Sequence, residues 1–338
     1  MKTEILKLDA SKKDITQIKK AAEIIRKGGL VAFPTETVYG LGADALNPDA
    51  CAKIFQVKQR PLYDPLIVHI ACKQDIFNIA EEIPRVAFDI IDRFWPGPLT
   101  LVLKKSDKIP YIVTGGLDTV AVRMPTHELA LLLIKESQTY IAAPSANLFG
   151  RPSPTTAQHV LEDLDGKIEL IIDGGKTEIG LESTIIDLTQ IPFCVLRPGG
   201  INFEDLKKII PDIQFYKGEK VLSPGRFKRH YSPKAKIFLM EANTYEDIEK
   251  IKKIASEFAV QGYSVGIMVK EENKDKYNSD FNIKVLGSEN NLTLCATRLY
   301  SILREFDKEA TQVIFAETIK EDYLGRAIMD RLRKASES

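Results

Sequence analysis

Residues 28–42 read Gly-Gly-Leu-Val-Ala-Phe-Pro-Thr-Glu-Thr-Val-Tyr-Gly-Leu-Gly, and this stretch decides the fold class. The preceding residues, 14–27, carry apolar side chains at helical spacing, and the glycine pair stops that helix. Residues 30–33 are a continuous apolar run, which predicts a buried strand, and Pro34 ends it. A helix that leads into a buried strand with polar residues at its end is typical of an α/β layer structure.

The same alternation continues to about residue 210. Because strands and helices follow each other irregularly, the pattern predicts a twisted mixed sheet and not a regular βαβ series. Further strands are expected at residues 66–70, 99–103, 119–122, 140–143, 170–172, 184–188 and 194–196, and helices at 49–57, 87–94, 128–137 and 156–164.

The composition changes after residue 210. Residues 211–235 contain prolines, glycines and a basic cluster with little periodicity, which predicts a linker. From residue 236 a second alternation predicts a smaller doubly wound, Rossmann-like α/β domain. The predicted organisation is therefore a first domain over 1–210, a linker over 211–235 and a C-terminal domain over 236–338.

The bulk composition is that of an ordinary globular protein and argues mildly against a nucleic-acid-binding one. The 338 residues are 44% hydrophobic and 28% charged, and 47 basic residues balance 47 acidic ones. A zero net charge argues mildly against a protein whose main task is to grip a phosphate backbone. No apolar run approaches the ~18 residues that a membrane span needs, and the first residues lack a signal-peptide pattern. We therefore expect a cytoplasmic protein without a membrane partner.

The standard catalytic motifs are missing from the sequence. It has no P-loop, no nucleophile elbow, no dinucleotide fingerprint, and no histidines or cysteines at metal-ligand spacing. We therefore predict no metal site made by the protein itself.

Cations follow the ends of several predicted elements instead. Lys58 and Arg60 come at the end of a short helix, and Arg123 and Arg197 each end a strand. Loops at strand ends can converge from distant parts of the chain, and four cations gathered there would suit a triphosphate and a carboxylate. Each cation also has a plainer interpretation, as a surface ion pair or as a complement to a helix dipole.

These segments together resemble the YrdC-like threonylcarbamoyl-AMP synthase family, in its two-domain form. One such motif would be weak, but the ordered series across residues 15–210 is specific, whereas residues 236–338 match by architecture more than by motif. The motifs that carry the resemblance are Pro34-Thr35-Glu36-Thr37-Val38-Tyr39-Gly40-Leu41-Gly42, Lys58-Gln59-Arg60-Pro61, Pro65-Leu66, His69, Trp95-Pro96-Gly97-Pro98, Arg123-Met124-Pro125, Ala143-Pro144-Ser145-Ala146-Asn147, Glu182-Ser183-Thr184 and Arg197-Pro198-Gly199.

The resemblance implies an enzyme that makes L-threonylcarbamoyladenylate from L-threonine, bicarbonate or CO2, and ATP, with release of pyrophosphate. This reaction is the first step of N6-threonylcarbamoyladenosine modification of tRNA. The resemblance also implies Mg²⁺ bound with ATP, a separate tRNA threonylcarbamoyl transferase complex that receives the product, and optional direct contact with tRNA. In the implied site, Lys58 and Arg60 act in catalysis; Thr35, His69, Arg123, Ala143 and Ser183 surround threonine; and Lys58, Arg60, Thr119, Ser145, Asn147, Ser153, Arg197 and Tyr231 hold ATP.

Two other functions remain open at this point. One is an RNA-binding or ribosome-associated module that uses a basic concave face, although the zero net charge counts against it. The other is an adenylating enzyme for a different amino acid, with the same nucleotide residues but a different pocket near Thr35 and Ser183.

The linker carries a prediction of its own. Residues 226–233 concentrate aromatic and basic side chains, whereas a plain tether would favour Gly, Ser and acidic residues. A mixed-anhydride product needs protection from water, so we expect this segment to act as a lid over the active site. A hinge that packs against the second domain is the alternative.

Overall fold

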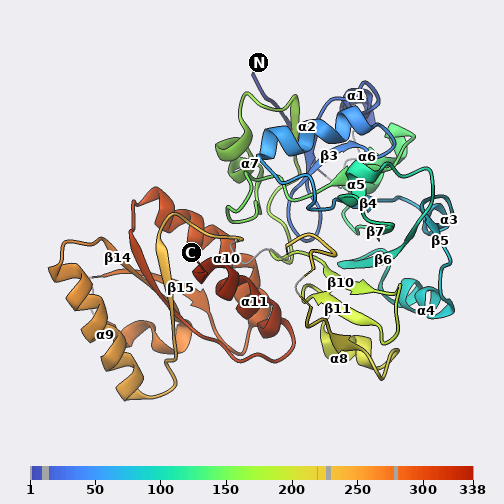
Figure 1. Cartoon of the computed structure of the whole chain (residues 1–338). Coiled ribbons are helices and arrows are strands. Elements are labelled where there is room, and N and C mark those ends of the chain that lie inside the picture. The colour runs from blue at the N-terminus through green and yellow to red at the C-terminus, as the bar shows by residue number, and fades with distance from the viewer. Residues whose placement is uncertain (1, 10–14, 219, 226–229, 278–280, 338) are drawn as a thin grey trace. The chain divides into compact units, whose positions relative to one another are not determined.

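The computed structural model describes residues 2–9, 15–218, 220–225, 230–277 and 281–337 (Figure 1). The chain divides into two compact units. The first unit comprises residues 1–149 and 153–226, and the second comprises residues 150–152 and 227–338. This division falls inside the segment that the sequence predicts as a linker. Within the described parts of the chain, every helix is too short or too polar to cross a lipid bilayer.

The first unit is built on a 12-stranded mixed sheet. Its spatial order is β1-β9-β2-β3-β8-β4-β7-β6-β10-β11-β12, and β5 pairs with β6 at one side. Parallel pairs such as β4–β7 alternate with antiparallel pairs such as β6–β7, so the predicted mixed sheet is confirmed. The strands are β1 (Glu4–Lys7), β2 (Val31–Phe33), β3 (Gly40–Asp44), β4 (Ile67–His69), β5 (Ala80–Glu81), β6 (Leu99–Lys105), β7 (Thr119–Arg123), β8 (Ile141–Ala143), β9 (Leu170–Asp173), β10 (Thr184–Asp187), β11 (Cys194–Arg197) and β12 (Gln214–Phe215).

Helices cover the two faces of this sheet unequally. Alternate strand residues such as Val68 and Leu101 join the main core with apolar residues of α2, α4, α5 and α7. On the opposite face, α1 and α6 pack over β2, β8 and β9. The helices are α1 (Ile15–Arg26), α2 (Pro48–Lys58), α3 (Ile76–Ile79), α4 (Arg85–Phe94), α5 (Tyr111–Thr114), α6 (Glu128–Ser137), α7 (Ala157–Leu164) and α8 (Phe203–Lys207), and a short 3-10 turn, η2 (Lys73–Asp75), precedes α3.

The other half of that second face, formed by β4, β7, β6, β10 and β11, has a different cover. Its apolar residues pack against Tyr216 and Leu222, which come from the predicted linker. We call residues 216–218 and 220–225 the cover segment. Strand alternation therefore directs the side chains of this half toward a loop and not toward a helix layer; the apolar ones are Ile67, Val102, Ala121, Ile185 and Leu196.

The second unit has the doubly wound arrangement that the sequence predicts. Its four strands, β13 (Lys236–Met240), β14 (Val265–Lys270), β15 (Asn282–Gly287) and β16 (Val313–Glu317), are all parallel, in the order β13-β16-β14-β15. Figure 1 shows α9 (Tyr245–Val260) on one side of this sheet and α10 (Leu292–Lys308) with α11 (Leu324–Ser336) on the other. A 3-10 turn, η3 (Glu271–Lys276), follows β14.

Several short elements were not predicted from the sequence. The most consequential is β3, because the glycine-rich end of the motif at 34–42 returns as a strand that pairs with β2. A Cβ on Gly42 would lie 2.7 Å from a side-chain atom of Ile141, so the sheet here has room only for glycine. Strand β12 lies within the predicted linker and pairs with β11, which extends the first unit's sheet past residue 210.

Candidate active site

Helix α2 carries Lys58 to the sheet. The Asn47 side chain accepts hydrogen bonds from the backbone amides of Asp49 and Ala50, and Pro48 occupies the first turn, so the helix start is strongly specified. Gln59 ends the helix in the left-handed conformation, with φ of 54°. The chain then turns toward Arg60.

The Lys58 ammonium lies inside the loop that follows β8. This side chain is 1% exposed, and its Nζ donates to the Ser145 carbonyl at 2.6 Å and to the Asn147 carbonyl. The Asn147 amide in turn donates to the Leu148 carbonyl at 2.7 Å. Three of the residues predicted to hold ATP are therefore brought together in one buried cluster.

Arg60 lies beside a buried carboxylate that the sequence did not single out. Its Nη2 lies 2.8 Å from Oδ2 of Asp64 and also donates to the Pro65 carbonyl, and its Nε donates to the Asp64 carbonyl. Burial raises the pKa of Asp64 to about 6, and the charges of Arg60, Lys58 and Arg197 act against that rise. One of the four predicted cations therefore pairs with this carboxylate, and the charges of two more act on it.

Arg197 ends β11 and reaches the residue before β10. Its Nη2 donates to the Ser183 carbonyl at 3.0 Å and contacts the Ser183 hydroxyl at 3.2 Å, and its Nη1 donates to the Pro224 carbonyl of the cover segment at 3.2 Å. The Ser183 hydroxyl also lies 2.7 Å from the Thr100 hydroxyl. This pair of buried hydroxyls connects β6 to Ser183, one of the residues predicted to bind the substrate threonine.

Arg123, the fourth cation, has a carboxylate of its own. Its Nη2 lies 2.6 Å from Oε1 of Glu36, and its Nε donates to the Gly97 carbonyl at 3.3 Å. The other Glu36 oxygen accepts from the backbone amide of Thr126 at 3.2 Å. Among the described residues, Nη1 of Arg123 has no hydrogen-bond partner, so this nitrogen is available for a ligand.

His69 pairs with Arg123 across β4 and β7. Its Nδ1 lies 3.1 Å from the Ile67 carbonyl, and its ring meets the edge of Phe33. Burial, reinforced by the nearby Arg123 charge, lowers the pKa of His69 to about 3, so the imidazole is neutral at neutral pH. A neutral imidazole beside an arginine can bind a polar group without repelling a substrate ammonium.

Hydroxyl groups complete this part of the site. The Thr35 hydroxyl donates to the Val38 carbonyl at 2.6 Å and lies 2.8 Å from the Thr37 hydroxyl, which fixes the loop between β2 and β3. Ala143 ends β8 and pairs with Ile67 of β4, two residues before His69. The sheet thus brings His69, Arg123 and Ala143 onto three neighbouring strands, and Thr35 lies in the loop that follows β2.

Three further predicted nucleotide residues have other partners. The buried Ser153 hydroxyl donates to Oε1 of Glu182 at 2.5 Å. Thr119 begins β7 whereas Arg123 ends it, so the two are about 13 Å apart along one strand. Tyr231 belongs to the second unit, where its ring stacks on Tyr300 with centroids 5.6 Å apart. Of the predicted lid, residues 226–229 lie outside the described residues.

Sequence reasoning missed the acidic partners of the cations. Glu36 stands inside a recognised motif, and Asp64 follows Arg60 by four residues; Glu182, the partner of Ser153, also stands inside a motif. The signal was therefore an acidic residue within or just after a motif. Each is at least nine-tenths buried. Buried carboxylates are rare unless they are paired, so their presence marks a site where charges are organised in advance.

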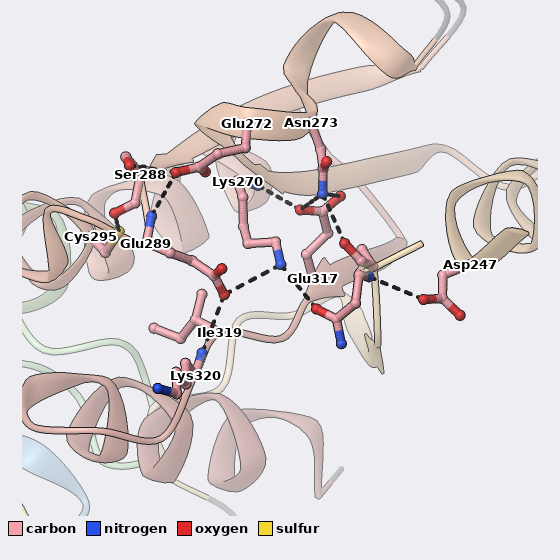
Figure 2. Close-up of polar contacts among 12 residues, drawn as sticks. Asp247, Lys270, Glu272, Asn273, Ser288, Glu289, Cys295, Glu317, Ile319 and Lys320 are labelled. Carbon is pink, nitrogen blue, oxygen red and sulfur yellow. Dashed lines mark hydrogen bonds and ion pairs between the residues drawn. The ribbon is translucent and has the colours of Figure 1, made fainter. Parts of the chain in front are cut away.

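A second polar cluster lies at the strand ends of the second unit (Figure 2). The buried Glu317 carboxylate accepts from the Lys270 backbone amide at 2.7 Å, the Asn273 amide at 3.1 Å and the Tyr277 hydroxyl at 2.7 Å. The Lys270 ammonium lies 3.3 Å from Glu289. Both Glu317 oxygens therefore have partners within the unit, so the cluster holds η3 over the ends of β14 and β16.

The chain is similar to known proteins over nearly its whole length. A family model for the Sua5, YciO and YrdC proteins, described as "Telomere recombination", matches residues 23–199, and one described as "Threonylcarbamoyl-AMP synthase, C-terminal domain" matches residues 201–337. The threonylcarbamoyl-AMP synthase of Pyrococcus abyssi is 48% identical over 95% of this chain and 94% of its own length. That of Bacillus subtilis is 45% identical over 95% of this chain and 93% of its own.

A solved structure is similar over nearly the whole chain. The crystal structure of P. abyssi Sua5 complexed with L-threonine has a TM-score of 0.92 and 45% sequence identity. The match covers 99% of this chain and 98% of that chain.

Proposed function

This chain belongs to the threonylcarbamoyl-AMP synthase family, and we propose that it makes L-threonylcarbamoyl-AMP from L-threonine, bicarbonate or CO2, and ATP, with release of pyrophosphate. The observation that carries the proposal is the separation of the buried cations into two groups. Arg123 pairs with Glu36 beside His69, whereas Arg60 pairs with Asp64, and the charges of Lys58 and Arg197 also act on that carboxylate. One group suits a single carboxylate, and the other suits a triphosphate.

L-Threonine is proposed to bind at the Arg123 end. A guanidinium matches a carboxylate through two parallel N–H donors, and Nη1 of Arg123 is unoccupied among the described residues. Thr35, His69 and Ala143 are proposed to border this position, because His69 pairs with Arg123 and Ala143 lies on the neighbouring strand β8. Ser183, the residue before β10, would complete it. The L-threonine complex of the Pyrococcus relative supports this choice of amino acid.

ATP is proposed to bind at the Lys58 end, with Arg60, Ser145, Asn147, Ser153 and Arg197 as contacts. Thr119 is proposed at the far end of β7, and Tyr231 stays a proposal from the family resemblance. Mg²⁺ would enter with ATP and be held mainly by phosphate oxygens. The Glu182 carboxylate, which accepts a hydrogen bond from Ser153, is the kind of oxygen ligand that Mg²⁺ prefers. When bound, the ion would neutralise charge on the phosphates.

The chemistry requires no covalent enzyme intermediate. The threonine amine adds to CO2, or displaces water from bicarbonate, and forms an N-carboxylate. That carboxylate attacks the α-phosphorus of ATP in line, and the bond to the leaving pyrophosphate breaks. Lys58 and Arg60 would act by positioning the phosphates and by stabilising the charge that develops on them.

The proposal includes protection of the product by the linker. The cover segment supports it, because Tyr216 and Leu222 lie on the same half-face as the site, and Pro224 accepts a hydrogen bond from Arg197. An acyl adenylate hydrolyses in water, so exclusion of solvent would raise its yield. Proteolysis near Gly225 should slow when ATP and threonine are both bound; cleavage at an unchanged rate would remove this part of the proposal.

The defining experiment is a turnover assay. The protein is incubated with ATP, Mg²⁺, labelled bicarbonate and each amino acid in turn, and the adenylate is identified by mass spectrometry. We expect labelled threonylcarbamoyl-AMP, and pyrophosphate release that requires both threonine and bicarbonate. A different amino acid in the product, or salt-sensitive RNA binding without turnover, would contradict the proposal. We further propose that a separate transferase complex in the cytoplasm uses the product to modify tRNA.

A further inference from the structure

Asp64 is a buried carboxylate that the proposed reaction does not use. Its side chain is fully buried, in the turn between α2 and β4. Oδ2 lies 2.8 Å from Nη2 of Arg60, yet neither carboxylate oxygen accepts a well-aligned hydrogen bond from the described residues. Buried carboxylates normally accept several hydrogen bonds, because burial without them costs free energy. Charge alone therefore accounts for the presence of this group.

The charges around Asp64 are those proposed to hold the ATP phosphates. Among the described residues, the charged groups that act on its carboxylate are Arg60 and Lys58, at the end of α2, and Arg197, at the end of β11. Three cations buried together would repel one another strongly at low effective dielectric. A single carboxylate among them reduces that repulsion, and its ion pair holds Arg60 in one orientation.

We propose that Asp64 is the resident counter-ion of the ATP-binding cations and takes up a proton from solvent when the triphosphate binds. This inference rests on the proposed function, because it needs the phosphates to bind at Lys58, Arg60 and Arg197. Each phosphate charge that arrives takes over part of the attraction that these cations exert on Asp64. The carboxylate and the triphosphate then become like charges close together, and protonation of Asp64 removes their repulsion.

Protonation of Asp64 near neutral pH costs little free energy. Burial already raises the pKa of Asp64 to about 6, with the three cations opposing the rise, so the group is largely ionised at pH 7 in the free protein. An anion that binds those cations raises this pKa further, through neutral pH. At pH 5 the free protein already carries the proton, and ATP binding then causes no additional uptake at Asp64.

The test is a proton inventory by calorimetry. Binding of Mg²⁺–ATP to the full chain is measured at pH 7 in buffers with different ionisation enthalpies, and the slope of the observed heat gives the protons taken up. Asp64→Asn keeps the side-chain shape but cannot titrate. The wild type should take up more protons than this variant, by a difference that approaches about one proton. Asp92→Asn, an exposed carboxylate on α4, is the matched control and should behave as the wild type.

Two further measurements separate the possible failures. The wild type is measured again at pH 5, where the uptake should shrink; this arm needs no variant and so survives if Asp64→Asn does not fold. Lys58→Ala tests the ATP site itself. If Lys58→Ala binds Mg²⁺–ATP as tightly as the wild type, the proposed ATP site is wrong. Binding that depends on Lys58, with equal proton uptake by the wild type and Asp64→Asn at pH 7, would overturn the role of Asp64 alone.

Discussion

At the residue scale, the pairing of Arg123 with Glu36 means that the proposed threonine site requires a guanidinium group at position 123. Arg123→Lys should weaken threonine binding far more than ATP binding, because an ammonium cannot contact Glu36, Gly97 and a substrate carboxylate in one fork. The expected loss is about 1.5–3 kcal/mol, measured by calorimetry with each ligand. Arg93→Lys, an exposed position on α4, is the control. Equal losses for both ligands would place Arg123 outside the threonine site.

His69 provides a prediction about pH. Its folded pKa of about 3 lies below its usual value, so between pH 6.5 and 3 the unfolded chain binds a proton that the folded chain does not. The His69 contribution to stability is therefore complete above pH 6.5 and falls as the pH decreases, by up to about 1.4 kcal/mol per pH unit.

Urea unfolding of the wild type and of His69→Gln at pH 7 and pH 5 measures this contribution. The wild type should lose more stability than the variant on going to pH 5. Asp64 acts with the opposite sign, because its raised pKa makes the folded state bind more protons over about pH 4–6. Because Asp64 is present in both proteins, its contribution cancels when the stability losses of the wild type and the variant are compared. Equal losses would mean that His69 titrates normally in the folded protein.

At the element scale, helix α2 and the turn after it position the side chains of Lys58 and Arg60. Lys58→Ala should reduce adenylate formation at least about tenfold, the effect of losing about 1.4 kcal/mol of phosphate interaction. Because the ammonium also holds the Ser145 and Asn147 carbonyls, the variant should remain folded but lose about 1–3 kcal/mol of stability. Gln56→Ala, an exposed position on the same helix, is the control for both readouts. Full activity in Lys58→Ala would contradict the phosphate role.

At the scale of the whole molecule, the first unit extends past the predicted domain end at residue 210. Strand β12 and the cover segment belong to it, so two truncated chains should behave differently. A chain that ends at Gly225 should keep a cooperative unfolding transition. One that ends at Ile210 loses β12 and exposes the apolar half-face under Tyr216 and Leu222, so it should unfold at lower urea and release more hydrolysed product. Identical midpoints and product yields for the two chains would contradict this role of the cover segment.

The sequence by itself determined the elements with strong local signals. The helical spacing over 49–57, the apolar run before Pro34 and the glycine stop after α1 each depend on nearby residues, and the helices and strands appeared there with small shifts in their ends. The α/β class and the doubly wound C-terminal unit followed from the same alternation. The candidate site residues came mainly from the ordered motifs, because local physics alone indicated only an anion-binding cleft.

Only the tertiary structure decided how the charges are paired. The sheet order brings Arg123 to Glu36, which is 87 positions away in the chain, and Arg197 to the hydroxyl of Ser183. It also places Arg197 where its charge, like that of Lys58, acts on Asp64. The short elements β3 and β12 likewise depend on their partner strands, because a few residues carry too little periodicity to specify a strand alone. Ion pairs and strand pairs between distant segments form only when the chain closes, and for that physical reason the sequence pattern identified the cations but not their partners.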